Sequence, residues 1–348
     1  MNVLIIKLSS LGDVLVSSPL PRLLCESYPD IKVDHLVMEH CSCITKANPY
    51  IRSQLIIPFL PTANRFSDLK VLLYIVRVIY AGHYDKVFIF HRNPLLSFLA
   101  KLGGGREIYG FRSRVNWFLN SSLEYTVKKN RTLLEVELLR AGGFDVKVPT
   151  KLDFYSNSEL PNEILGLLPD KYIVCNPGGG NKHAPADNRI WPIEYYINTI
   201  NSIDLPFVLL GSGDEDFYRA AKILDQLGNK VVNLVNKTSF SSSATIIKNS
   251  ELYLGNDSSL VFLAAAMGVK SISLYGPTQA EAALPIGPNQ YYLKSNTPCS
   301  PCYDPFLELN GKMYTCKNNI CMQSIQPNSV IKAILNLISN DKSEKDNS

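Results

Sequence analysis

Residues 251 to 278 read ELYLGNDSSLVFLAAAMGVKSISLYGPT. This stretch joins an apolar run that predicts a strand, four small polar residues from Asn256 to Ser259, and an Ala-rich run that predicts a helix. A polar turn between a strand and a helix leaves unpaired backbone N–H groups that favour an anion. The same residues would also suit the ordinary N-cap of a core helix, so this stretch alone leaves both interpretations open.

The N-terminal residues have a similar organisation. The apolar run from Val3 to Leu8 does not alternate with polar residues, which predicts a parallel strand buried on both faces. A short Ser/Gly loop with Asp13 follows, and then a helix from about Val14 to Tyr28, which Pro29 ends. Open α/β sheets bind ligands at the carboxyl ends of their strands. The loop lacks the G-x-G-x-x-G dinucleotide pattern, and Asp13 would also suit a helix cap.

Four segments, in order along the chain, match patterns of one known family. They are K-x-S-S-x-G-D at Lys7, Ser9, Ser10, Gly12 and Asp13, N-P-G-G-G at Asn176 to Gly180, R-I-W-P at Arg189 to Pro192, and Asp257-Ser258 followed by the Ala-rich helix and Tyr275 to Thr278. With these segments the chain resembles glycosyltransferase family nine, the ADP-heptose:lipopolysaccharide heptosyltransferases, over about residues 1 to 335. Ser259 and Phe262 stand where the family usually has Gly and His, so one polar group near the donor is missing.

The resemblance implies the α/β fold called GT-B, with two Rossmann-like α/β/α domains facing across a cleft. Alternating strand and helix patterns agree with parallel sheets. A polar stretch around residues 153 to 167 predicts a linker. We therefore expect an acceptor-side domain over residues 1–155, a nucleotide-sugar-binding domain over residues 156–338, and a disordered tail over residues 339–348. The last helix, about Asn328 to Ile338, is expected to cross back to the first domain.

Apolar runs predict the individual strands. They lie at Val3–Leu8, Val33–Val37, Gln54–Pro58 and Lys86–His91 in the first half, and at Tyr172–Asn176, Phe207–Leu210, Val231–Leu234, Leu252–Gly255 and Ser271–Tyr275 in the second half. A strongly apolar stretch, Asp68–Ala81, predicts a helix. Its apolar face would suit either the protein core or a membrane interface.

A sugar transfer with inversion needs a base for the acceptor hydroxyl and stabilisation of the departing nucleoside diphosphate. The family's pattern assigns the base to Asp13, and we expect the acceptor to lie against Ser10, Gly12 and Arg92. On the donor side we expect glycines that let the backbone approach phosphate, a basic group for the diphosphate, a carboxylate for the ribose and amides at a helix start. These residues are Gly178, Gly179, Gly180, Arg189, Glu215, Asp257, Ser258 and Ser259.

Two of these assignments have further alternatives. Asp257 is a poor phosphate ligand, and we expect it to cap the helix and orient its amides. Glu215 would suit the first turn of a helix as well as a ribose site. The sequence has no D-x-D pattern, and the family usually acts without divalent ions, so no catalytic metal or other cofactor is expected.

Eight cysteines fall into two groups. Four are scattered and suit a reducing compartment. The other four, called here the four-cysteine segment, have the spacing C-x2-C-x13-C-x4-C and are Cys299, Cys302, Cys316 and Cys321. This spacing is compatible with a structural zinc ion, and free or paired thiols are the alternative.

Charge and hydropathy limit the partners. The net charge is +4. Basic residues outnumber acidic ones in residues 1 to 153, and acidic residues outnumber basic ones in the rest of the chain. The first half would therefore suit an anionic glycolipid acceptor at the inner membrane surface, or simply carry a solvated basic face. No nucleic-acid motif is present. With no membrane-spanning apolar segment and no signal-peptide pattern, we expect a cytoplasmic location with peripheral membrane contact.

The function predicted from the resemblance is transfer of heptose from ADP-heptose to a lipopolysaccharide core-type acceptor, with inversion. One alternative keeps the fold and uses a hexose from another nucleotide donor. The second alternative is a homologue that binds a nucleotide but does not catalyse transfer. Asp13 argues against this second alternative, and Phe262 favours it.

Overall fold

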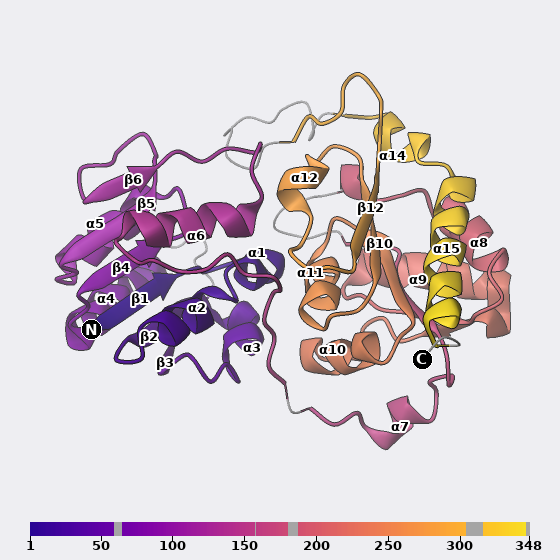
Figure 1. The fold of residues 1–348 in the computed structure, drawn as a ribbon, viewed down its shortest axis with the longest axis horizontal. Helices are drawn as coiled ribbons and strands as arrows, with labels where there is room; N and C mark the ends of the chain where they lie inside the picture. The colour runs from indigo at the N-terminus through magenta and orange to yellow at the C-terminus, as the bar shows by residue number, and fades with distance from the viewer. Residues whose placement is uncertain (59–64, 157, 180–186, 304–315, 346–348) are drawn as a thin grey trace. The chain divides into compact units, whose positions relative to one another are not determined.

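The computed structural model describes residues 1–58, 65–156, 158–179, 187–303 and 316–345 (Figure 1). The chain divides into two compact units, unit 1 from Met1 to Tyr155 and unit 2 from Ser156 to Ser348. Each unit contains a six-stranded parallel sheet covered by helices, so the expected α/β fold of GT-B type is confirmed at the level of the two Rossmann-like units.

Unit 1 has the strand order β3-β2-β1-β4-β5-β6, and every adjacent pair is parallel. Its strands are β1 (Asn2–Ile6), β2 (Lys32–Met38), β3 (Ser53–Ile57), β4 (Lys86–Ile89), β5 (Glu107–Phe111) and β6 (Ser121–Leu123). Its helices are α1 (Leu11–Val16), α2 (Leu20–Ser27), α3 (Ser42–Thr45), α4 (Arg65–Gly82), α5 (Pro94–Leu102), α6 (Arg131–Ala141) and the 3-10 turn η1 (Glu39–Cys41).

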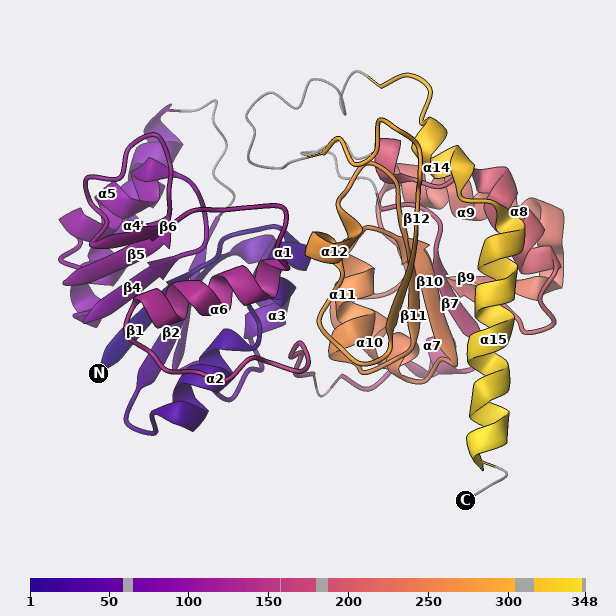
Figure 2. The same ribbon diagram turned by 45° about the horizontal axis from the view of Figure 1, so that its top comes forward.

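The central strand β1 belongs to two hydrophobic cores, as its unbroken apolar run predicts. Val3 and Ile5 pack with α2 and α6 on one face of the sheet, whereas Leu4 and Ile6 pack with α4 and α5 on the other. Figure 2 shows α2 and α6 together on one side of this sheet. Alternate residues of a strand point to opposite faces, so a strand buried on both faces needs no polar alternation.

The single helix expected from Val14 to Tyr28 is wrong, because two helices occupy this stretch. Helix α1 ends at Val16, and α2 begins at Leu20, directly after Pro19. Proline has no N–H group for the preceding turn and is favoured at helix starts, so it separates the two helices.

Unit 2 has the strand order β12-β11-β10-β7-β8-β9, again parallel throughout. Its strands are β7 (Ile173–Asn176), β8 (Phe207–Leu209), β9 (Val231–Asn233), β10 (Leu252–Asn256), β11 (Ser271–Tyr275) and β12 (Gln290–Lys294). Its helices are α7 (Asn162–Leu165), α8 (Ile193–Asn201), α9 (Asp214–Leu227), α10 (Phe240–Lys248), α11 (Ser259–Ala266), α12 (Ala280–Ala283), α14 (Ile320–Ser324) and α15 (Pro327–Lys345), with 3-10 turns η2 (Asp187–Arg189) and η3 (Gly228–Lys230).

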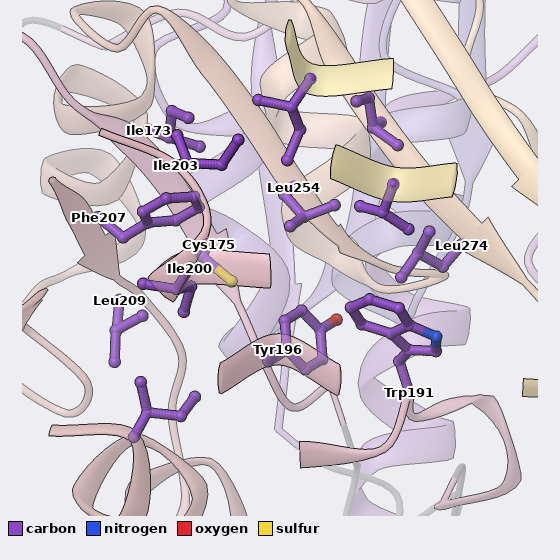
Figure 3. Packing of buried hydrophobic residues seen from close by; sticks show 14 of the residues in the cluster. Ile173, Cys175, Trp191, Tyr196, Ile200, Ile203, Phe207, Leu209, Leu254 and Leu274 are labelled. Atoms are coloured by element: carbon purple, nitrogen blue, oxygen red, sulfur yellow. The ribbon is translucent and has the colours of Figure 1, made fainter. Parts of the chain in front are cut away.

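The core of unit 2 is built around two aromatic side chains (Figure 3). Trp191 and Tyr196 are fully buried, with ring centroids 4.9 Å apart in an edge-to-face arrangement. The indole Nε1 of Trp191 donates a hydrogen bond of 2.8 Å to the carbonyl of Ile325, just before α15. This bond satisfies the buried indole and ties the C-terminal helices to the sheet.

The end of the chain differs from the sequence prediction. Helix α15 continues to Lys345 rather than ending near Ile338, so residues 339 to 345 are helical and not a disordered tail. Val330 and Ile334 of α15 belong to the core of unit 2, and α15 packs beside α8 (Figure 2). The last helix therefore belongs to unit 2.

Candidate active site

The centre of the sheet in unit 1 is a topological switch point, where neighbouring strands β1 and β4 lead outward in opposite directions. Ligands of open α/β sheets bind beyond the carboxyl ends of such strands. Asp13 follows β1, and His91 and Arg92 follow β4. The fold therefore brings these three residues to the same edge of the sheet.

Asp13 lies in the first turn of α1, and its carboxylate is held by Ser10, the N-cap residue of this helix, and by Arg131 of α6. Its Oδ2 atom accepts hydrogen bonds from the Ser10 amide at 3.1 Å and the Ser10 hydroxyl at 2.9 Å, and Oδ1 lies 3.6 Å from Nη1 of Arg131. Burial opposes the negative charge, but Lys7, Arg131 and the Ser10 hydrogen bonds outweigh it, so the pKa of Asp13 lies below its ordinary value. The group is ionised at neutral pH.

A buried ion pair lies close to Asp13. Lys7 Nζ is 2.7 Å from Glu135 Oε1 and also donates to the carbonyl of Phe90 at 3.2 Å. The second Glu135 oxygen accepts a hydrogen bond of 2.6 Å from the hydroxyl of Ser17, the C-cap residue of α1. Burial raises the pKa of Glu135, and Lys7 and Ser17 partly offset this effect. Lys7, Glu135 and Ser17 thus connect the end of β1, the end of α1 and α6.

His91 supports the loop between β1 and α1 from β4. Its Nε2 atom accepts a hydrogen bond of 2.8 Å from the backbone amide of Leu8. Burial, followed by the charge of Lys7, lowers the pKa of His91 to about 3, so the imidazole is neutral and acts as an acceptor. The sequence interpretation did not include His91, although its position directly after β4 is a usable signal.

The three residues expected at the acceptor lie near Asp13 in the chain or at the same sheet edge. Ser10 precedes α1 and binds the Asp13 carboxylate, and Gly12 is buried within α1. Arg92 follows β4, and its Nε donates to the carbonyl of Arg112 at 2.8 Å. Their contact with an acceptor stays a prediction.

Unit 2 has its own switch point between β7 and β10, and each of these strands ends in an asparagine. Asn256 donates to the carbonyl of Gly178 at 2.7 Å and accepts from the Trp191 amide at 3.0 Å. Asn176 accepts a hydrogen bond of 3.2 Å from the hydroxyl of Ser258. These buried amides join the loop after β7 to the start of α11 and to the segment that carries Arg189.

Arg189 and Asp257 form a partly buried ion pair at this edge. Arg189 Nη1 lies 3.2 Å from Asp257 Oδ2, which also accepts a hydrogen bond of 2.8 Å from the Thr278 hydroxyl. Asp257 is 4% exposed. The expectation that Asp257 caps the helix is wrong, because Ser258 is the N-cap residue of α11 and Asp257 pairs with Arg189 instead. These contacts join two of the four sequence segments, R-I-W-P and the one that runs from Asp257 to Thr278.

Arg189 contacts Asp257 and Tyr303, while its Nε atom has no partner among the described residues. Its guanidinium lies 5.1 Å from the ring centroid of Tyr303, a cation–π distance. Its Nε atom is buried and has no hydrogen-bond partner within the described part of the chain. Buried N–H donors are normally satisfied, so this atom points to a missing anionic or carbonyl partner.

The glycines after β7 are needed for close packing against a carboxylate that the sequence interpretation missed. A Cβ atom on Gly178 would lie 1.8 Å from Oδ1 of Asp216, and Gly179 has φ of +111° with its amide donating to Asp216 at 3.0 Å. Asp216 also accepts from the amide of Ser212 at 3.1 Å. Gly178 and Gly179 therefore let Asp216 fix the loop. Gly180 lies outside the described residues.

A pocket with about 220 Å³ of space opens beside Thr278 in unit 2. Its lining includes the charged pair Glu281 and Lys294, which contact each other, and the polar residues Ser295 and Thr297. It extends the edge that carries Arg189 and Asp257, because Thr278 belongs to both.

The model of glycosyltransferase family 9 (heptosyltransferase) matches residues 82–309, which is more than half of the chain. The chain belongs to this family. Lipooligosaccharide heptosyltransferase 2 of Campylobacter jejuni is 28% identical over 226 residues, which cover 62% of this chain and 65% of that protein. Lipopolysaccharide heptosyltransferase 3 of Escherichia coli K12 is 24% identical over 279 residues, covering 77% and 80% respectively. The chain thus spans just under two thirds of the Campylobacter relative.

Solved structures of the family share the fold over nearly the full length. The ADP-heptose lps heptosyltransferase II of E. coli has a TM-score of 0.75 at 18% identity, covering 98% of this chain and 100% of that one. A family 9 glycosyl transferase from Veillonella parvula has a TM-score of 0.79 at 20% identity, covering 97% of each chain. At these identities the likeness establishes the fold.

The remaining donor-side residues of this family 9 chain are separated by the fold. Ser258 and Ser259 begin α11 at the Arg189 edge. Glu215 lies in the first turn of α9, where its side chain is more than half exposed and pairs with Arg219 at 2.9 Å. This pair stabilises the helix, and a ribose contact of Glu215 stays a prediction. Phe262 is buried in α11, so it packs in the core where the family usually has His.

All four cysteines of the four-cysteine segment lie within the described residues. Burial raises the pKa of Cys321 to about 11, and the other three cysteines add to this effect. All four are free thiols, and within the described residues no group of three or more His, Cys, Asp or Glu side chains has an arrangement that would hold a metal ion. A structural zinc ion stays a prediction.

Proposed function

We propose that this family 9 protein transfers heptose from ADP-heptose to a lipopolysaccharide core-type acceptor, with inversion at the anomeric carbon and without a catalytic metal. Family membership supports sugar transfer, and the names of the relatives, lipooligosaccharide heptosyltransferase 2 and lipopolysaccharide heptosyltransferase 3, support the sugar and the acceptor class. The observation that carries the proposal is the ionised Asp13 carboxylate, held at the switch point of unit 1 by Ser10, Arg131 and the charge of Lys7.

In this proposal Asp13 is the general base. Its carboxylate accepts the proton of the acceptor hydroxyl while that oxygen forms the new glycosidic bond and the bond to the diphosphate breaks. A lowered pKa keeps the base charged across the neutral range, and it also makes Asp13 a weak base. Most of the rate enhancement must therefore come from positioning and from stabilisation of the leaving group.

The leaving diphosphate is assigned to unit 2. Its negative charge would be met by Arg189, whose Nε has no hydrogen-bond partner among the described residues, and by the amides at the start of α11. Asp257 holds the guanidinium from the other side through Nη1. The pocket beside Thr278 provides space for the sugar portion of the donor.

The experiment combines purified protein, ADP-heptose and a deacylated core acceptor, with products identified by mass spectrometry and anomeric configuration by NMR. We expect heptose transfer with inversion, and retained activity in the presence of a chelator. The Asp13→Asn variant should lose about 10² or more of its turnover, while Asp30→Asn, on an exposed loop, should not change.

Retention of configuration would overturn the proposed chemistry. Transfer from a hexose nucleotide but not from ADP-heptose would favour the alternative donor, a possibility raised by Phe262. Nucleotide binding without transfer from any donor would favour the non-catalytic alternative. Wild-type turnover in Asp13→Asn would remove this residue from the mechanism.

A further inference from the structure

Exposed apolar side chains are concentrated on one part of unit 1. Of the eleven large exposed apolar side chains that the structure describes in unit 1, eight lie in α4, in α5 or in the loop between β5 and β6. They are Leu69, Leu73, Tyr74, Tyr80, Leu95, Phe98, Leu102 and Trp117. Single exposed apolar residues are normal on protein surfaces, but a group of this size marks an interaction site.

On α4 three of the four exposed apolar residues that the structure describes form one row. Leu69, Leu73 and Tyr80 are separated by four and seven residues, so they project from the same side of the helix. The opposite side, with Val71, Ile75 and Ile79, is buried against the sheet.

Helix α5 continues this surface. Leu95, Phe98 and Leu102 are separated by three and four residues and are exposed. The ends of the two helices are adjacent, because a Cβ atom on Gly103 would lie 2.7 Å from the side chain of Ile79, and one on Gly104 would lie 4.0 Å from the ring of Tyr80.

The loop between β5 and β6 adds a tryptophan to the same side. The ring of Phe118 lies 5.3 Å from that of Phe98 on α5. The neighbouring Trp117 is 88% exposed. Tryptophan and tyrosine are the residues most favoured at the boundary between lipid and water. We call this set of eight residues on α4, α5 and the loop the α4–α5 surface.

Among the described side chains of α4, α5 and the loop between β5 and β6, which exclude that of Asp68, the charged ones are all basic. Lys70 and Arg77 on α4 and Lys101 on α5 are exposed. The sequence contains no Asp or Glu between residues 69 and 82, between 94 and 106, or between 112 and 120. In unit 2, by contrast, exposed Phe217 and Tyr218 of α9 lie beside acidic residues of the same helix.

We propose that the α4–α5 surface binds an anionic lipid bilayer. Leucines and aromatic rings flanked by lysine and arginine are the composition of interfacial helices, which bury the apolar side chains among the headgroups and attract anionic lipid. A second copy of the chain fits less well, because a symmetric dimer through this surface would bring its lysines and arginines against one another.

Docking in this way has a geometric consequence for the reaction. Helices α4 and α5 both follow strands, so Leu69 and Leu95 lie toward the carboxyl edge of the sheet, the edge that carries Asp13. The lipid surface would thus meet unit 1 near the base. The relevance of this geometry to the reaction rests on the proposed lipid-linked acceptor, whereas the proposal that the α4–α5 surface binds lipid does not depend on that acceptor.

The test is co-sedimentation of the full chain with vesicles of phosphatidylethanolamine and phosphatidylglycerol, compared with pure phosphatidylcholine. We expect binding to the anionic vesicles that salt weakens. The Leu69→Ser/Leu73→Ser variant should bind at least about tenfold more weakly, because each leucine loses apolar area for burial. Lys70→Ala/Lys101→Ala should lose about thirtyfold, which corresponds to about 1 kcal/mol per basic residue.

Matched controls lie in unit 2. Leu165 and Leu167 are 57% and 51% exposed, close to the 51% and 59% of Leu69 and Leu73, and their replacement by Ser should leave vesicle binding unchanged. Lys237→Ala/Lys248→Ala is the control for charge. Thermal unfolding confirms that the variants are folded.

Equal vesicle binding by the surface variants and the wild type would overturn the proposal, as would equal losses in the controls. A dimer that the Leu69→Ser/Leu73→Ser variant dissociates, without vesicle binding, would assign the surface to a second copy instead. Activity on a deacylated acceptor in solution tests the proposed function separately, and it should be the same in all surface variants.

Discussion

Replacement of Lys7 by methionine is the sharpest perturbation of the site in unit 1. Methionine keeps most of the length of the side chain and removes the charge, so the buried Glu135 carboxylate loses its partner at 2.7 Å. The hydrogen bond from Lys7 to the carbonyl of Phe90 is lost as well. Ser17 remains as a donor to Glu135, which is 3% exposed.

The expected loss of stability is large. Removal of one partner from a buried ion pair typically costs about 3–5 kcal/mol, because the other charge stays buried without compensation. The total stability of a domain is about 5–15 kcal/mol. The double variant Lys7→Met/Glu135→Gln should recover most of the loss, since it leaves no buried charge and Ser17 can still donate to the glutamine oxygen.

Hydrogen exchange measured by mass spectrometry is the suitable assay, because it reports each unit separately. Peptides from β1 and α6 should lose protection in Lys7→Met and regain it in the double variant, while peptides from β7 and β10 serve as the internal control. Additive losses in the double variant would refute the argument, because an additive result means that Lys7 and Glu135 do not interact energetically.

The same substitution should alter the pH dependence of catalysis. Lys7 is the leading charge that lowers the pKa of Asp13, so that pKa should rise in Lys7→Met. The acidic limb of the kcat/KM profile should then move to higher pH, because the proposed base is protonated earlier. If the acidic limb of the profile does not move, Lys7 does not influence the pKa of Asp13.

Three further predictions concern other parts of the chain. Arg189→Ala should weaken ADP binding, measured by calorimetry, by about 1.5–3 kcal/mol. Adding Asp257→Asn to this variant should restore the stability that is lost with the ion pair but not the affinity for ADP. Unchanged ADP affinity in Arg189→Ala would place the diphosphate elsewhere. Burial lowers the pKa of His35 to about 3 from its ordinary 6.5, so the unfolded chain binds the extra proton and His35 costs about 1.4 kcal/mol of stability per pH unit as the pH falls below 6.5. His91 has a similarly lowered pKa and adds a contribution of its own. His35→Leu should therefore make the dependence of thermal unfolding on pH less steep between pH 6.5 and 5, and an unchanged slope would contradict this reasoning. If the four-cysteine segment holds zinc, the purified protein should carry close to one equivalent that acidification releases, whereas metal-free protein with readily alkylated thiols would exclude it.

Nine of the twelve described strands could be predicted from sequence, including the edge strands β3 and β9. Strands β1, β4, β7 and β10 are buried on both faces, so their apolar runs are unbroken. Strands β5, β6 and β12 were not predicted. β6 has three residues, and β12 mixes exposed and buried positions at the sheet edge. Such strands are defined by the neighbour that they pair with, which a local pattern does not contain.

Candidate site residues could be proposed from sequence, but the contacts that hold them in place could not. The motifs correctly indicated the loops after β1, β7 and β10 as positions of polar residues. They did not indicate Glu135, which lies 128 residues from Lys7 and meets it only in the folded unit. The run Asp214, Glu215, Asp216 offers three carboxylates in one helical turn, and only packing against Gly178 determines that Asp216 is the buried one.

Because each unit is one uninterrupted segment of the chain, the ribosome completes unit 1 before it makes unit 2. The unit 1 sheet can then form while the later residues are still being translated. In unit 2 the central strand β7 must wait for its partner β10, which begins at Leu252. Such non-local pairing folds slowly. The sheet edge that holds Arg189 and Asp257 can therefore form only late in translation, after β10 has been synthesised.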